Sequence, residues 1–232
     1  MTERGPDSLT EEATEAIRDT VDDIKPKLRG WLHAALWPLA FFSFLVLLVL
    51  ADNVLVRAGA AVFMFSALAL FGVSAVYHTG RWSDRARTIW KRVDHATIFV
   101  LIAGSYTPFT LMLLSTQQAV ILLSVVWGGA ILGVLFRIFW LGAPRWMYVP
   151  LYLLLGWAAV FYFPEFSREA PTAVMVLLIV GGGLYTLGAL VYGFKKPDPW
   201  PAWYGFHEVF HTLTIAAFIV HYIGVSILAY TR

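Results

Sequence analysis

The chain has 232 residues, of which 59% are hydrophobic and only 14% are charged, and its mean hydropathy is +0.70. An ordinary soluble domain carries about 25% charged residues, so this composition excludes a water-soluble enzyme and predicts a protein that crosses a membrane several times. The chain contains no cysteine, which excludes disulfides and thiolate ligands; a transition-metal site here must use His, Asp, Glu or water. The formal net charge of +2 gives no indication of a nucleic-acid partner.

The first 30 residues differ sharply from the rest of the chain. They hold eight of its 15 acidic residues and lack the apolar core of a signal peptide. Ser8-Leu9-Thr10-Glu11 is typical of a helix start, and apolar residues follow it at helical spacing. We expect residues 1–30 to be a polar cytosolic segment, either a short amphipathic helix or a solvated tail, and residues 31–232 to be the membrane domain.

Seven hydrophobic segments follow, each close to the roughly 20 residues that cross a bilayer. The connections between them are short, and we find neither a soluble domain nor an internal repeat. The predicted fold class is therefore an all-α bundle of seven transmembrane helices, the third kinked at Pro108. The expected spans are 31–50, 55–78, 93–114, 118–138, 147–163, 172–193 and 206–230.

Lysine and arginine set the expected orientation. With these spans, 14 of the 17 Lys and Arg residues fall on the side of the N-terminus, and three, Arg57, Arg168 and Arg232, fall on the other. Because cytoplasmic loops are enriched in Lys and Arg, we expect a cytoplasmic N-terminus. The odd number of spans then puts the C-terminus outside, as in a multi-pass protein of a bacterial plasma membrane.

Rare polar side chains converge at the cytoplasmic side of this predicted bundle. Ser74 and His78 end the second span, Asp94 begins the third, and His207 and His211 lie in the first turns of the seventh. Residues four apart share one helix face, so the two histidines of the last span can hold one metal ion. The orientation therefore predicts that three helices bring these groups to one depth.

Zinc is the metal that this set of residues favours. A catalytic zinc takes three protein ligands and keeps one position for water, and His78, His207 and His211 supply three nitrogens. Asp94 is either a fourth ligand or, as we prefer, a partner of the metal-bound water and acceptor of its proton. The Ser74 hydroxyl either orients that water or bonds a backbone carbonyl of its own helix.

The sequence also resembles the haemolysin III family, the bacterial branch of the progestin and adipoQ receptors, which is related to ceramidase-like membrane hydrolases. The resemblance runs from about Gly30 to the C-terminus. It implies a seven-helix fold, zinc on His78, His207 and His211, and an aspartate at Asp94 near the zinc-bound water. The stretches that carry it are 74–78 (SAVYH), 94–99 (DHATIF), 103–109 (AGSYTPF), 181–188 (GGGLYTLG) and 207–211 (HEVFH).

The remaining polar residues of the spans have less specific readings. His207 to His211 also matches H-E-x-x-H, in which the glutamate serves as a base, but Glu208 points about 100° from His207 on a helix. We expect Glu208 to face the interface or a basic loop residue such as Lys195. His95 is assigned a structural role, His33 an interfacial position, and His221 an interior hydrogen bond about 15 Å from His211.

Four functions remain open at this point. The leading hypothesis is a zinc-dependent hydrolase that cleaves an ester or amide of a lipid-like substrate entering from the bilayer. The second is a non-enzymatic receptor or regulator of membrane homeostasis with structural zinc, and the third is a cytolysin, as the family name implies. The fourth is a proton or ion carrier that uses Asp94, His95 and His221. The sequence does not determine the oligomeric state.

Overall fold

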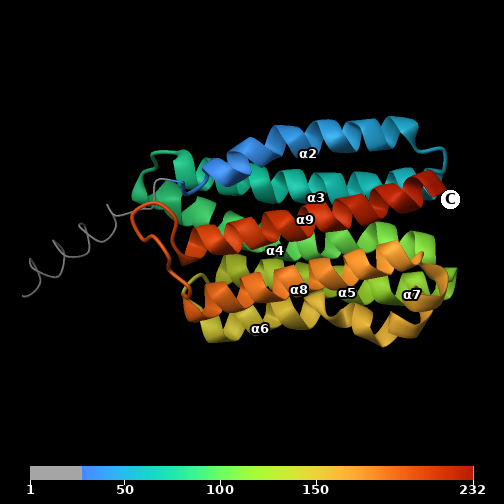
Figure 1. The fold of residues 1–232 in the computed structure, drawn as a ribbon. Helices are drawn as coiled ribbons and strands as arrows, with labels where there is room; N and C mark the ends of the chain where they lie inside the picture. Colours follow the sequence, from blue (N-terminus) through green and yellow to red (C-terminus); the bar gives the residue numbers. More distant parts are fainter. Residues whose placement is uncertain (1–27, 232) are drawn as a thin grey trace, which may run out of the picture.

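The computed structural model describes residues 28–231, and the segment expected at residues 1–30 lies almost wholly outside that range (Figure 1). Within the described residues the fold is all-helical, and seven helical spans are long and apolar enough to cross a membrane. The helices are α2 (Trp31–Leu50), α3 (Val54–Thr79), α4 (Asp84–Leu113), α5 (Thr116–Phe139), α6 (Arg145–Gly156), the 3₁₀ helix η1 (Ala158–Tyr162), α7 (Phe163–Glu169), α8 (Thr172–Phe194) and α9 (Phe206–Thr231).

Two of the expected segments differ from the observed ones. The fifth span is not a continuous helix over 147–163, because α6 ends at Gly156 and the chain passes through η1 into α7, which has Pro164 in its first turn. α4 begins at Asp84, well before the expected residue 93. Ser83 caps it by accepting a hydrogen bond from the Ala86 amide, and Asp84 stabilises its positive end. Hydropathy therefore located the apolar stretch of α4 but not its charged first turns.

Small residues allow the central helices to pack closely. A Cβ at Gly104 of α4 would lie 2.4 Å from the Ser66 Cβ of α3, and a Cβ at Gly59 of α3 would lie 2.7 Å from the Pro108 Cα of α4. Such contacts are the usual means by which transmembrane helices approach one another. α4 stays helical through Pro108, so the proline lies inside a tight helix pair.

The ends of the helices determine where the polar residues meet. The starts of α2, α4 and α9 and the end of α3 lie together at one end of the bundle, whereas the C-terminus of α9 lies at the opposite end (Figure 1). His78, Asp94 and His207 lie near these ends, in three different helices. The antiparallel arrangement of neighbouring helices thus brings distant parts of the sequence to one depth.

Candidate metal centre

Three histidines face one another at this end of the bundle. His78 of α3 and His207 and His211 of α9 each offer one ring nitrogen, and these three atoms lie within 4.8 Å of one another. His211 is buried, and the other two are half-buried. The i, i+4 spacing on α9 places His207 and His211 on one helical face, with their ring centroids 4.5 Å apart.

The distance between two of these nitrogens matches that in a zinc site. Nε2 of His207 lies 3.3 Å from Nε2 of His78. Nitrogens that bind one tetrahedral zinc at about 2.0–2.1 Å are separated by roughly 3.3 Å. The Nδ1 atom of His211 is buried and makes no hydrogen bond among the described residues. A three-imidazole set of this geometry can hold a metal ion.

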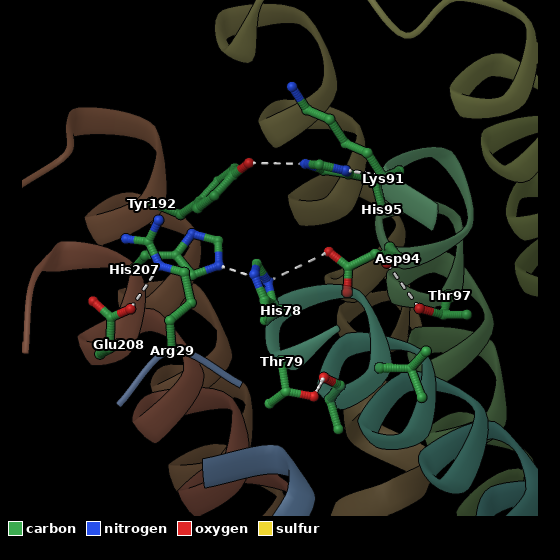
Figure 2. A network of polar contacts seen from close by, with 12 residues as sticks. Arg29, His78, Thr79, Lys91, Asp94, His95, Thr97, Tyr192, His207 and Glu208 are labelled. Carbon is green, nitrogen blue, oxygen red and sulfur yellow. Dashed lines mark hydrogen bonds and ion pairs between the residues drawn. The ribbon is translucent and has the colours of Figure 1, made fainter. Parts of the chain in front are cut away.

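Asp94 lies across His78 from His207 (Figure 2). Its Oδ2 atom is 3.9 Å from Nε2 of His78, but it does not join the group of three nitrogens that lie within 4.8 Å of one another. Ser74 lies one turn before His78 in α3 and is buried beside the Asp94 carboxylate. The predicted proton acceptor Asp94 and its neighbour Ser74 therefore both adjoin the triad.

Glu208 is fully buried and forms an ion pair with the partly exposed Arg29, away from the triad. Its Oε1 accepts a hydrogen bond from Nε of Arg29 at 2.8 Å, and its Oε2 accepts one from the Gly205 amide at 2.9 Å. The expected partner, a basic loop residue such as Lys195, is thus a different basic residue, Arg29, in the turn before α2. Oε1 fixes the start of α9 to Arg29, whereas Oε2 accepts from the backbone just before α9, so both oxygens have structural partners (Figure 2).

We expected His33 of α2 to be interfacial, but the structure buries it against the triad. Its ring stacks on that of His211 with centroids 4.0 Å apart, and neither of its ring nitrogens has a hydrogen-bond partner among the described residues. Gly30 permits this approach: it has a φ of +86°, and a Cβ there would lie 2.7 Å from the His78 Cβ. A left-handed conformation and a close backbone contact both favour glycine.

His95 points away from the triad, as expected of a structural residue. Its Nδ1 lies 2.6 Å from the Lys91 carbonyl and its Nε2 lies 3.1 Å from the Tyr192 hydroxyl of α8 (Figure 2). The Tyr152 hydroxyl of α6 donates to the His95 carbonyl. These bonds join α4, α6 and α8 beside the metal centre.

A cavity of about 510 Å³ begins at the triad and continues between the helices. Its polar end is formed by His33, Ser74, Asp94, His207 and His211, and most of its remaining wall is apolar. Trp157, Val160 and Ile179 line it and are also exposed on the outside of the bundle. The cavity therefore reaches the lipid-facing surface between η1 and α8.

Comparison with known proteins identifies the family of this membrane protein. A family model described as "Haemolysin-III related" matches residues 22–222, which is most of the chain. The chain belongs to the haemolysin III family.

Relatives of this haemolysin III protein occur in bacteria and animals. It is 33% identical over 146 residues to a "Hemolysin-3 homolog" of Bacillus subtilis, covering 62% of this chain and 68% of the relative. It is 33% identical to "Hemolysin-3" of Bacillus cereus over 45% of this chain and 48% of the relative. The "Adiponectin receptor protein" of Drosophila melanogaster is 31% identical over 73% of this chain and 42% of the relative. The chain thus spans less than half the length of the latter two.

Two neighbours of the triad in this haemolysin III protein escaped prediction. His33 begins the first span on the same side as His78 and His207, so the argument from depth that selected those residues also applies to His33. Arg29 carries no such signal, because nothing in its local sequence distinguishes it from the other basic residues near the N-terminus. Its role depends on the buried position of Glu208.

Proposed function

We propose that this protein is a zinc-dependent hydrolase that cleaves an ester or amide bond of a membrane lipid. The observation that carries the proposal is the position of the three-histidine cluster at the polar end of an otherwise apolar cavity that reaches the lipid-facing surface. His78, His207 and His211 would hold the metal. A zinc ion bound there supplies Lewis acidity, which polarises a carbonyl and makes a water molecule acidic near neutral pH.

The residues around the triad have distinct proposed roles. Asp94 accepts a proton from the attacking water at Oδ2, since its carboxylate adjoins His78 but stands outside the cluster of ligand nitrogens. Ser74 keeps that carboxylate in place or donates a hydrogen bond to the developing oxyanion. The apolar wall holds an acyl chain, which enters sideways between η1 and α8.

A receptor or regulator with structural zinc remains the second candidate, and the similarity to a protein named an adiponectin receptor favours it. A structural zinc site is closed by four protein ligands, so Asp94 would have to bind the metal directly. Asp94 stands outside the group of ligand atoms that lie within 4.8 Å of one another, although its Oδ2 is 3.9 Å from His78 Nε2. Its place outside this group favours the hydrolase.

We also propose that the metal centre lies on the cytoplasmic side of a bacterial plasma membrane. The basic residues Arg81, Arg87, Lys195 and Lys196 lie in or beside the connections at the same end of the bundle as the triad (Figure 1). The opposite end has Arg57 and Arg168 within the described residues. The excess of positive charge supports this orientation.

Hydrolysis assays on the purified, zinc-loaded protein test the catalytic proposal. We expect turnover of at least one class among ceramides, glycerophospholipids and N-acyl amides, and a loss of about 100-fold or more in Asp94→Asn with zinc retained. His95→Ala serves as the control for a buried polar residue of α4 outside the triad. Fully zinc-loaded wild type without turnover across the three classes would overturn the proposal, and so would an unchanged rate in Asp94→Asn.

A further inference from the structure

The far end of the cavity contains a second pair of polar side chains. His221 of α9 lies ten residues beyond His211, which is about 15 Å along a helix, and Tyr185 projects beside it from α8. Their ring centroids are 5.5 Å apart, and both residues line the same cavity as the triad. The largely apolar cavity therefore has polar residues at two separate places, the triad and the pair of His221 and Tyr185.

This pair lacks enough protein partners to satisfy its polar atoms. Nδ1 and Nε2 of His221 and the hydroxyl of Tyr185 are buried, and none makes a hydrogen bond with the described residues. The backbone of Leu178 lies near the imidazole, but even that group could serve only one of the two ring nitrogens. At least one ring nitrogen of His221 therefore lacks the interior hydrogen bond that we expected, although unsatisfied buried polar groups are costly and native structures contain few of them.

The surrounding helix is shaped to admit the His221 ring. A Cβ at Gly181 of α8 would overlap Cδ2 and Nε2 of His221, so any larger residue there would displace the imidazole from its present position. Phe109, which packs against the imidazole with a centroid distance of 5.6 Å, and Leu178 are apolar parts of the cavity wall here. The site thus combines a closely fitted histidine with a phenol, and among residues 28–231 the phenol and at least one ring nitrogen have no hydrogen-bond partner.

We propose that His221 and Tyr185 form a subsite for a second polar group on the lipid, a hydroxyl or carbonyl carried part-way along its chain. An imidazole and a phenol can each donate and accept one hydrogen bond, which matches a neutral hydroxyl. A charged group is disfavoured, because the described wall here offers no counter-ion to offset its desolvation. The inference rests on the proposed function in that it assigns the cavity to the lipid, and it narrows the ligand class to oxygenated acyl chains.

Ricinoleate and oleate provide a matched pair of probes, because they differ by a single hydroxyl in the outer half of the chain. Binding to the purified full-length protein in nanodiscs is measured by displacement of a fluorescent fatty acid. We expect wild type to bind ricinoleate about tenfold more tightly than oleate, as one well-placed buried hydrogen bond allows. Tyr185→Phe, which removes one oxygen atom, and His221→Leu should each bring the two affinities to within about threefold.

The control removes a hydroxyl outside the cavity. Tyr222 follows His221 in α9, and its hydroxyl donates to the Ser43 carbonyl of α2; Tyr222→Phe should keep the preference for ricinoleate. Equal affinities in wild type overturn the subsite, which would then hold only water, and so does a preference that survives both substitutions. Failure of both probes to bind also overturns it. A preference for ricinoleate without lipid hydrolysis would contradict the proposed function but not the subsite. Zinc-dependent hydrolysis without that preference would contradict the subsite but not the proposed function.

Discussion

The ring of His33 in α2 stacks on the ring of His211 in the triad, with centroids 4.0 Å apart. His33 does not belong to the group of three nitrogens that could share an ion. Its ring instead limits the positions available to the ring of His211. Groups that hold a metal ligand in place commonly contribute about 10- to 100-fold to metal affinity.

Substitution of His33 should therefore weaken metal binding without abolishing it. We expect His33→Ala to lower zinc affinity by about tenfold, measured by competition with a chromophoric chelator, because the His211 ring gains freedom. His33→Phe keeps a flat ring in the stack and should retain most of the affinity. An affinity in His33→Ala equal to that of wild type would show that the stack does not position His211.

At this scale the sequence predicted the residues but not all of their contacts. His78, His207 and His211 were selected by their helical spacing and shared depth, and the structure brings them together. For Glu208 a basic partner was expected, with Lys195 as the example, but the residue that pairs with it is Arg29, since helix geometry indicates the direction of a side chain but not which distant residue meets it. Arg29 and Glu208 are 179 positions apart, and only the packing of α2 against α9 joins them.

Among the helical elements, α9 depends on the residues that precede α2. The Arg29–Glu208 pair fixes the first turn of α9, which carries His207, and Glu208 is fully buried whereas the Arg29 side chain is 23% exposed. Loss of one partner from a buried ion pair strands the other charge, at a typical cost of about 3–5 kcal/mol. The pair therefore contributes to both stability and the geometry of the metal centre.

Arg29→Ala should lower the stability of the folded protein by about 3 kcal/mol and reduce its thermal midpoint in detergent. Glu208→Gln should cost less, about 1 kcal/mol, because the amide oxygen still accepts one of the two hydrogen bonds and the partly exposed Arg29 guanidinium can be hydrated. Arg81→Ala, at an exposed arginine after α3, is the control and should leave the midpoint unchanged. If Arg29→Ala behaves like Arg81→Ala, the ion pair does not hold the two helices together.

The broken fifth span shows what element prediction from hydropathy leaves out. Composition identified an apolar segment over 147–163, but α6 stops at Gly156 and α7 restarts the helix six residues beyond Trp157. Tyr106 of α4 stabilises the break, since its hydroxyl donates to the Gly156 carbonyl and accepts from the Ala159 amide. Such a tertiary contact has no signature in the local sequence of the span.

For the molecule as a whole, the number of spans could be predicted because each apolar segment matches the thickness of a bilayer. The cavity could not be predicted, because it depends on how the seven spans pack and on the space that remains between them. The orientation in the membrane remains a prediction from the distribution of Lys and Arg.

Reporter fusions at the C-terminus test this orientation. We expect alkaline phosphatase fused after residue 232 to be active and a green fluorescent protein fused there to be dark, because the C-terminus lies outside the cytoplasm in the proposed topology. Truncation after Lys196, between α8 and α9, should reverse the two readouts. The opposite pattern would place the metal centre on the outer side.

The proposed function depends most directly on a metal ion bound by the three histidines. Elemental analysis of protein purified without chelator should give about one zinc per wild-type chain and almost none for His78→Ala, His207→Ala or His211→Ala, since each loses one of only three ligands. His95→Ala and His221→Ala should keep their zinc, because neither residue belongs to the triad. Full zinc occupancy in His78→Ala, or a metal-free wild type that does not take up added zinc, would contradict the account.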